Sequence, residues 1–340
     1  MKDRKSDKAF ASRLIRWQKA HGRHDLPWQQ GRAADPYRVW LSEIMLQQTQ
    51  VATVIPYYRR FLGRFPDLAS LASAPAQEVM ALWSGLGYYA RARNLQRAAQ
   101  EVVARHGGRF PRRLEDIAAL PGIGRSTAAA IAVFAFGARA AILDGNVKRV
   151  LTRVFGIAGF PGEKAVEQRL WALAEALLPE GDPIAYTQGL MDLGATLCTR
   201  SRPRCDDCPL AAQCLARRED RVAELPTPRA RRAVPQRAVS VLVLLNRGSV
   251  LLERRPPSGI WGGLLSLPEL PPGKTPRRYA DARPLAVVRH AFTHFRLDIA
   301  PLLLKVGRRE TAIEGIWLSL KRLEQAPLPA PIRKILMGLI

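Results

Sequence analysis

The stretch that decides the fold reads Leu120-Pro-Gly-Ile-Gly-Arg-Ser-Thr-Ala-Ala-Ala-Ile131, a glycine-rich turn that opens onto an apolar helix. Gly122 and Gly124 permit positive φ and a close backbone approach, and the start of the helix points free N–H groups outward. A turn of this kind can hold a phosphate group without reading any base. The stretch therefore predicts a phosphate-binding turn at a helix start.

A carboxylate follows soon after this turn, in Leu143-Asp-Gly-Asn-Val-Lys148. The motif predicts a second helix start, with Asp144 among polar and basic neighbours. An acidic side chain close to bound phosphate is electrostatically costly, so its presence needs a reason. Asp144 could serve only as the N-cap of the helix, or it could take part in chemistry, and the motif alone leaves both interpretations open.

The composition points to a globular protein with a polyanionic partner. The 340 residues are enough for two domains with their own cores, and 53 Lys and Arg against 29 Asp and Glu give a formal net charge of +24. This excess is spread over both halves of the chain and favours nucleic acid. A membrane is disfavoured because no apolar run approaches the roughly 20 residues of a spanning helix. The charged N-terminus lacks a signal-peptide core, so we expect a cytoplasmic protein.

The pattern of apolar residues divides the chain into two parts. Residues 8–216 are typical of an all-α domain, with apolar stripes at helical spacing over 39–58, 78–83, 95–103 and 165–178. Residues 217–237 are charged and contain prolines, which predicts a linker. Beyond it we expect strands at 238–245, 249–254 and 297–306, so residues 238–340 form an α+β domain.

The cysteines are gathered in one short loop with the spacing C-x6-C-x2-C-x5-C. They are Cys198, Cys205, Cys208 and Cys214. In a protein that is not secreted, this pattern indicates a metal site before disulfides. Zinc ribbons usually have two separated C-x2-C pairs, whereas here one pair lies between two single cysteines. The spacing therefore favours an iron–sulfur cluster over zinc.

Two further motifs carry residues suited to DNA chemistry. Glu43 lies in Ser42-Glu-Ile-Met-Leu-Gln-Gln-Thr-Gln-Val51, where apolar neighbours would desolvate its carboxylate and raise its pKa, although most glutamates are simply exposed. The polar residues 47–50 could bond base edges or only line a helix. In Gly85-Leu-Gly-Tyr-Tyr-Ala-Arg-Ala-Arg-Asn94, aromatic and basic side chains together suit base stacking and phosphate neutralisation, although a tyrosine here could also pack in the core.

Residues 8–216 resemble the helix-hairpin-helix DNA glycosylases, specifically the MutY-type adenine DNA glycosylases. The resemblance rests on Trp40–Val51, Gly85–Tyr89, Leu120–Ser126, Leu143–Arg149 and the cysteine spacing. It implies that the four cysteines hold a [4Fe–4S] cluster. In the related endonuclease III type, a lysine at the position of Ser126 forms a Schiff base for strand cleavage. Ser126 cannot form an imine, so the resemblance implies a monofunctional glycosylase that uses water, with little or no lyase activity.

The resemblance also implies catalytic roles for the matching residues. Cleavage of an N-glycosidic bond needs one protonated acid and one ionised carboxylate. Glu43 matches the acid that protonates adenine N7 and later activates water. Asp144 matches the carboxylate that stabilises the cationic sugar, and Asn146 and Ser126 complete the candidate catalytic set.

A base inside a duplex cannot react, so adenine must flip into a pocket. By resemblance, the candidate pocket residues are Leu26, Trp28, Val51 and Gln188. The candidate DNA contacts are Gln48, Thr49, Leu86, Tyr88, Gly122, Gly124 and Lys148. Among the DNA contacts, Gln48, Leu86 and Tyr88 would fill the gap left by adenine and probe the opposite base.

The segments 254–265 and 288–298 resemble the C-terminal Nudix-like domain of the same family, which helps to recognise 8-oxoguanine opposite adenine. A working Nudix hydrolase needs several glutamates to hold magnesium, and residues 262–290 contain only Glu269, so we exclude that activity. Phe292, Thr293 and His294 stand where many members have Phe-Ser-His. Thr293 keeps the hydroxyl and adds a methyl group. The region between 267 and 287 is short, which indicates a trimmed domain.

The sequence thus predicts a multi-domain protein. An all-α helix-hairpin-helix glycosylase domain with an iron–sulfur cluster (8–216, including the Cys198–Cys214 loop) is followed by a linker (217–237) and an α+β Nudix-like domain (238–340). We expect a bacterial, cytoplasmic, nucleoid-associated monomer that acts on double-stranded DNA. Its expected reaction is removal of adenine mispaired with 8-oxoguanine or guanine. The alternatives are an endonuclease III-like pyrimidine glycosylase/lyase and a DNA-binding module without activity.

Overall fold

The computed structural model describes residues 4–29, 34–230, 233–271, 277–309 and 313–340. These residues form two compact units. The first comprises Met1–Val51 and Glu101–Arg231, and the second comprises Ala52–Gln100 and Arg232–Ile340. The units divide the predicted all-α region, because residues 52–100 group with the C-terminal part of the chain. The boundaries predicted at 216 and 238 stay a prediction, and residues 231 and 232 of the predicted linker lie outside the described residues.

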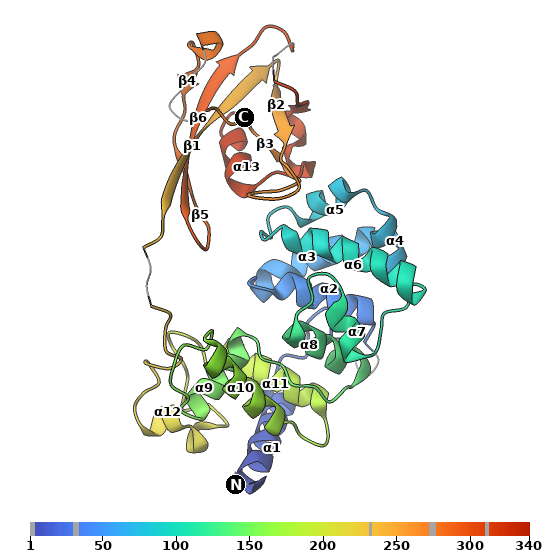
Figure 1. Ribbon diagram of the computed structural model, residues 1–340, viewed down its shortest axis with the longest axis vertical. Helices are drawn as coiled ribbons and strands as arrows, with labels where there is room; N and C mark the ends of the chain where they lie inside the picture. The colour runs from blue at the N-terminus through green and yellow to red at the C-terminus, as the bar shows by residue number, and fades with distance from the viewer. Residues whose placement is uncertain (1–3, 30–33, 231–232, 272–276, 310–312) are drawn as a thin grey trace. The chain divides into compact units, whose positions relative to one another are not determined.

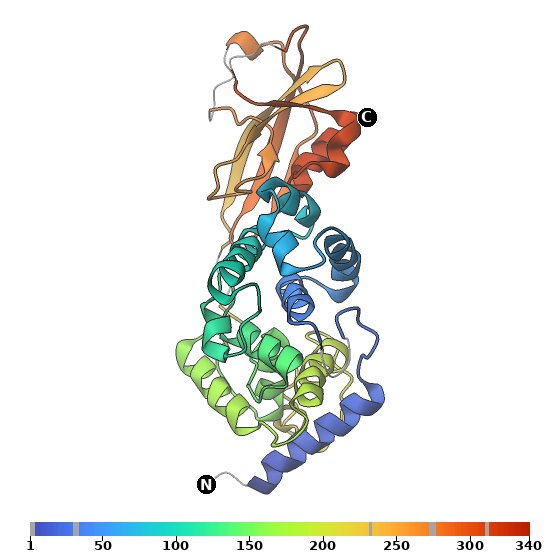
Figure 2. The same ribbon diagram turned by 90° about the vertical axis from the view of Figure 1, so that its right-hand side faces the viewer.

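The first unit is helical. Its elements are α1 (Arg4–His21), α2 (Pro36–Leu46), α7 (Leu114–Ala119), α8 (Arg125–Phe136), α9 (Gly145–Val154), α10 (Lys164–Ala176), α11 (Pro183–Thr196), η2 (Ala211–Gln213) and α12 (Leu215–Arg218). Two further helices contain residues assigned to both units, α3 (Val51–Arg64) and α6 (Ala90–His106). Within the first unit, α1 lies beside α11, as Figures 1 and 2 both show. Leu14, Leu151 and Leu193 belong to the core that α1, α9 and α11 share.

Local sequence sets the ends of the helices that matter most here. The apolar and alanine-rich α8 ends at Gly137, which adopts the left-handed conformation (φ 68°) that helix ends favour. Asp144 caps the start of α9, and Asp182 caps the start of α11, where Pro183 follows at the first helical position. These three signals fix where the neighbouring loops begin.

The predicted helical stripe over residues 39–58 is divided between two helices. α2 ends at Leu46 and α3 begins at Val51, and the residues between them form a turn. Gln48 has a φ of 57° in this turn, a conformation that non-glycine residues rarely adopt. The break falls on the four polar residues 47–50, which could equally have formed the polar face of one helix, so the pattern alone does not reveal the turn.

The second unit combines helices with a sheet. Its helices are α4 (Leu68–Ser73), α5 (Ala76–Trp83) and α13 (Ala330–Met337), beside parts of α3 and α6 and the short turns η3 (Arg277–Tyr279) and η4 (Leu320–Gln325). Its strands are β1 (Gln236–Asn246), β2 (Ser249–Arg254), β3 (Leu265–Ser266), β4 (Arg283–Pro284), β5 (Val288–Ala291), β6 (Arg296–Lys305) and β7 (Ile316–Ser319). The predicted strands at 238–245, 249–254 and 297–306 are confirmed as β1, β2 and β6.

In the described residues the strands form one sheet of order β3-β2-β1-β6-β4, with β5 on β6 and β7 on β2. The long strands β1 and β6 run parallel, paired from Gln236 with Arg296 to Leu245 with Lys305. β2 returns antiparallel to β1 through the tight turn at Arg247 and Gly248. Leu242 and Leu251 lie in the core beside this sheet. Among the described helices, none has the length and apolar character needed to cross a bilayer.

Candidate active site

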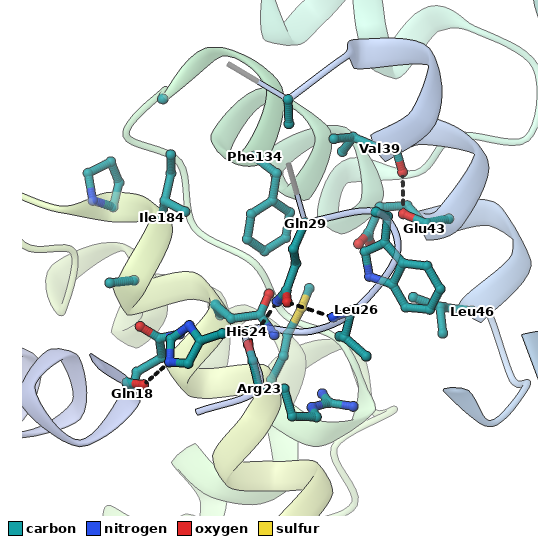
Figure 3. A pocket seen from close by; sticks show the side chains of 18 of the residues that line it. Gln18, Arg23, His24, Leu26, Gln29, Val39, Glu43, Leu46, Phe134 and Ile184 are labelled. Atoms are coloured by element: carbon teal, nitrogen blue, oxygen red, sulfur yellow. Dashed lines mark hydrogen bonds between the residues drawn. The ribbon is translucent and has the colours of Figure 1, made fainter. Parts of the chain in front are cut away.

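A cavity of about 920 Å³ lies within the first unit, between α1, the loop after it, α2, α8 and α11. Figure 3 shows Val39, Glu43 and Leu46 of α2 on one side and Ile184 of α11 on the other. The structure places all four candidate pocket residues in the lining, which includes Leu26, Trp28, Val51 and Gln188. The cavity is large and apolar enough to receive a flipped base.

Glu43 contributes a carboxyl group to this lining. The side chain sits deep among the apolar residues of α2 but remains open to the cavity. Burial, followed by the nearby charge of Asp144, raises its pKa from 4.5 to about 8. The predicted increase is confirmed, and Glu43 is protonated at neutral pH.

Asp144 is the N-cap of α9. Its Oδ1 accepts a hydrogen bond of 2.7 Å from the backbone N–H of Val147, which confirms the N-cap interpretation. Burial raises the pKa of Asp144 above its usual value, because its effect outweighs the lowering by the N–H groups of Val147 and Asn146 and by the charges of Arg149 and Lys148. Since Glu43 and Asp144 repel when both are ionised, the single negative charge of the pair is best placed on Asp144, where these donors and cations support it.

Ser126 does not face the cavity. From the first turn of α8, its Oγ accepts a hydrogen bond of 2.9 Å from the backbone N–H of Leu143. The hydroxyl therefore ties the helix after the glycine turn to the residue before Asp144. This contact fixes the backbone immediately before Asp144.

Two residues that sequence reasoning missed hold Asn146 in place. The guanidinium of Arg149 donates to Asn146 Oδ1 (2.8 Å), to the carbonyl of Gly194 (2.7 Å) and to the carbonyl of Cys198 (2.7 Å). A Cβ at Gly194 would lie 2.5 Å from Asn146 Cβ, so only glycine fits there. Arg149 belongs to the Leu143–Arg149 motif, but its partners on α11 become visible only in the fold.

The glycine turn has the geometry of an open helix start. Gly122 has a φ of 79°, and the N-cap Gly124 supplies no side-chain acceptor to the first turn of α8. These backbone donors suit a phosphate oxygen. Lys148 lies one helical turn after Asp144 and is paired with Glu167 at 2.5 Å. The candidate DNA contacts Gln48 and Thr49 lie in the turn between α2 and α3, where Gln48 is exposed.

The remaining candidate DNA contacts lie in the second unit. Tyr88 is exposed (48 %) with a φ of 48°, and its hydroxyl lies 3.3 Å from Thr293 Oγ1. Thr293 and His294 are exposed in the turn between β5 and β6, while Phe292 stacks on Phe295 with ring centroids 4.4 Å apart. Leu86 is only 5 % exposed, so its side chain is packed inside the unit and does not point outward.

The four cysteines line one small apolar cavity beside α9 and α11. Burial, and then the neighbouring thiols, raise the pKa of Cys208 to about 11, so thiolates here need nearby positive charge. The buried Arg153 donates to Cys198 Sγ at 3.4 Å and to the carbonyls of Thr199, Arg200 and Leu225. Within the described residues no group of three or more ligating side chains converges on a single ion. The four thiols around a shared space fit a multinuclear iron–sulfur group better than one ion.

Two family models match separate parts of the chain. The family described as HhH-GPD superfamily base excision DNA repair protein matches residues 41–176, and the NUDIX domain matches residues 240–338. A solved structure of a thermostable thymine-DNA glycosylase superposes with a TM-score of 0.58 at 32 % identity, over 63 % of this chain and 98 % of that chain.

Two curated relatives carry the same name. The human adenine DNA glycosylase is 48 % identical over 217 residues, which is 62 % of this chain and 39 % of the human protein. The adenine DNA glycosylase of Buchnera aphidicola subsp. Schizaphis graminum is 34 % identical over 340 residues, covering 96 % of this chain and 97 % of the relative. Because this match spans both parts of the chain, the protein belongs to the adenine DNA glycosylase family, whose members are DNA repair enzymes that hydrolyse N-glycosidic bonds.

Proposed function

We propose that this protein removes adenine mispaired with 8-oxoguanine, and with guanine, from double-stranded DNA and leaves an abasic site. The observation that carries the proposal is the protonated carboxyl group of Glu43 in the cavity lining, with the carboxyl group of Asp144 near enough to interact with it. Glu43 holds a proton near neutral pH, because its pKa is raised to about 8. Asp144 lies close enough for its charge to contribute to that shift.

Glu43 acts first as a general acid. Its proton passes to N7 of the flipped adenine, and the electron pair of the C1′–N9 bond leaves with the base. A cationic sugar remains, and the Asp144 carboxylate stabilises it. Water then adds to C1′, and the carboxylate of Glu43 takes up the released proton, which restores the starting state. Asn146 would hold the carboxylate or the attacking water in position, and Arg149 fixes its side chain.

Hydrolysis without strand cleavage follows from the side chain at position 126. Ser126 has no amine to form a Schiff base, and its hydroxyl is engaged by Leu143. Water is therefore the nucleophile in this proposal. An endonuclease III-like lyase reaction would need an amine here.

In this proposal the protein contacts both the DNA backbone and the base opposite adenine. The open helix start at Gly122–Gly124 binds a phosphate. Tyr88 and Thr293 present two hydroxyl groups 3.3 Å apart at an exposed position, which suits hydrogen bonds to the edge of 8-oxoguanine. Because the substrate is chromosomal DNA, the enzyme works at the bacterial nucleoid in the cytoplasm.

The four cysteines are proposed to hold a [4Fe–4S] cluster. When bound, the cluster supplies cationic iron that stabilises the buried thiolates and fixes the loop from Cys198 to Cys214. Arg153 reaches Cys198 and three backbone carbonyls around this loop. The loop carries arginines at 200, 202 and 204, which then contribute positive charge toward the DNA backbone.

The test is a gel assay on duplexes that carry adenine opposite 8-oxoguanine, guanine or thymine, followed by cleavage with alkali. We expect strand breaks only after alkali, on the first two duplexes and not on the third. Borohydride in a parallel reaction tests for a covalent adduct. Efficient trapping with strand cleavage before alkali would instead identify a glycosylase/lyase.

A further inference from the structure

A buried carboxylate stands behind the wall of the cavity. Asp192 lies on α11 with its side chain 1 % exposed, outside the cavity lining. Its Oδ1 accepts hydrogen bonds of 2.8 Å from Arg23 Nε and from Gln188 Nε2, and its Oδ2 accepts one of 2.9 Å from the backbone N–H of Arg23. Arg23 Nη2 also lies 2.8 Å from Oδ1. The charge of Asp192 is therefore fully compensated within the protein.

The residues around Asp192 are packed so closely that they fix its position. Gly22 packs so closely that a Cβ there would lie 2.5 Å from the carbonyl of Gln18 and 3.0 Å from Asp192 Oδ2. Arg23 begins the loop that leads to Leu26 and Trp28 in the cavity lining. Asp192 thus joins that loop to α11 and fixes both walls of the cavity.

The contact with Gln188 determines which end of its amide faces the cavity. Gln188 precedes Asp192 by one helical turn and is itself part of the lining. A carboxylate paired with arginine only accepts hydrogen bonds, so the amide must turn its NH2 group toward Asp192. Oε1 of Gln188 is then left as the acceptor that meets a bound base.

We propose that Asp192 is a positioning residue that holds the Gln188 amide in one orientation, and so makes the cavity select a 6-aminopurine over a 6-oxopurine. This inference rests on the proposed function. The exocyclic amine of adenine donates to Oε1. A 6-oxopurine would bring a second acceptor against Oε1 and leave both oxygens without a donor. Arg23 takes part by holding the Asp192 side chain in place.

Asp192→Asn tests the orientation directly. An asparagine at 192 can donate to Oε1 of Gln188, which lets the glutamine amide turn and present its NH2 to the base. Single-turnover rates are measured with the full-length, cluster-loaded protein on duplexes with adenine or hypoxanthine opposite 8-oxoguanine. We expect the adenine-to-hypoxanthine rate ratio to fall about ten- to a hundredfold relative to wild type. Glu78→Gln removes an exposed partner of Arg64 in the second unit, and serves as the control that keeps the wild-type ratio.

Gln188→Leu provides a second test if Asp192→Asn does not fold. This variant keeps the Arg23–Asp192 pair and removes both ends of the amide. An amide fixed as an acceptor favours only adenine, so Gln188→Leu should lower the ratio by about tenfold or more. An amide that turns freely would serve both bases equally, and wild type and Gln188→Leu would then share one ratio.

The outcomes separate this inference from the proposed function. Absence of adenine release by wild type overturns the proposed function. Suppose instead that wild type releases adenine. An adenine-to-hypoxanthine rate ratio that is unchanged in folded Asp192→Asn or in Gln188→Leu then overturns the positioning role alone. An equal loss of both rates in Asp192→Asn would also overturn it, because such a loss reports a structural effect without selectivity.

Discussion

The hydroxyl of Ser126 accepts a hydrogen bond from the backbone N–H of Leu143, 2.9 Å away, and so connects the glycine turn to the residue that precedes Asp144. The glycine turn and the Asp144 carboxyl group are thereby held in one frame. Under the proposed function, DNA bound at Gly122–Gly124 would meet Asp144 at a fixed spacing. Positioning of this kind is a large part of what a catalytic site contributes to rate.

Ser126→Ala should weaken that frame. The Leu143 N–H loses its acceptor, so we expect the free energy of unfolding to fall by about 1 kcal/mol and the rate of adenine release to fall by about tenfold. Urea unfolding and single-turnover kinetics measure the two effects. Ser126→Thr keeps the hydroxyl and should stay near wild type. A wild-type rate in Ser126→Ala would mean that the contact has no positioning role.

Asp144→Asn should separate binding from chemistry. Asparagine still caps α9 through Val147, so the fold and binding of the mispaired duplex should be retained. The charge that stabilises the cationic sugar is lost, and we expect adenine release to fall by at least about a hundredfold. Asp67→Asn changes another helix N-cap, in the second unit, and should leave the rate unchanged. Near wild-type release by Asp144→Asn would remove Asp144 from the mechanism.

The raised pKa of Glu43 predicts how activity depends on pH. Adenine release should decline as pH rises above about 8, because Glu43 then loses the proton that it must donate. Glu43→Gln cannot donate this proton and should be inactive at every pH. Single-turnover rates between pH 6 and 10, about two units on either side of this pKa, measure the decline. A rate independent of pH up to 10 would contradict the role of Glu43 as the acid.

The same pKa predicts a dependence of stability on pH. Between pH 4.5 and about 8, the folded chain keeps a proton on Glu43 that the unfolded chain has lost. Stability contributed by this group is therefore present below pH 4.5 and is lost as pH rises through 8. Glu43→Gln cannot ionise, so its stability relative to wild type should grow across this interval, by about 1.4 kcal/mol or more. Thermal unfolding at several pH values measures it, and parallel curves would contradict a buried, protonated Glu43.

Thr293→Ala should reduce recognition of the opposite base. Loss of the hydroxyl beside Tyr88 removes one hydrogen-bonding group, and we expect the preference for 8-oxoguanine:adenine over guanine:adenine to fall by about tenfold. Thr293→Ser keeps the hydroxyl without the methyl group and is the matched control. Competition binding with the two duplexes reports the preference. Equal preference in Thr293→Ala and wild type would assign recognition to other residues.

The sequence predicted those parts of the protein that depend on local patterns. The all-α and α+β regions, the strands β1, β2 and β6, the N-cap at Asp144 and the raised pKa of Glu43 all follow from spacing or from neighbouring residues. Contacts between segments that are distant in the sequence could not be predicted from these local patterns. The pairing of β1 with β6 joins residues 60 apart, and the bonds of Arg149 to Gly194 and Cys198 depend on how α9 packs on α11.

The sequence also does not predict the backbone conformation of Gln48 or the burial of Leu86. The turn at Gln48 lies in the polar run 47–50, and the positive φ of Gln48 at the helix break has no signal in a sequence of ordinary polar residues. Leu86 follows a glycine and precedes another, which indicates a loop, yet its side chain is buried. The position of Ser126 in its motif suggests a role in the chemistry, whereas its hydrogen bond with the Leu143 N–H shows that it organises the backbone.

One consequence of α11 concerns genetic change. Along this helix, Gln188 faces the cavity, Asp192 bonds Arg23 and Gly194 accommodates Asn146, and the chain then continues to Cys198. An inserted or deleted codon between 188 and 194 would rotate every later side chain by about 100° and shift it by about 1.5 Å. A missense change affects one of these contacts, whereas such an indel would misalign Gln188 in the cavity, the contact with Asn146 and the cysteine loop at once. Natural variation in α11 should therefore consist of substitutions at a constant length.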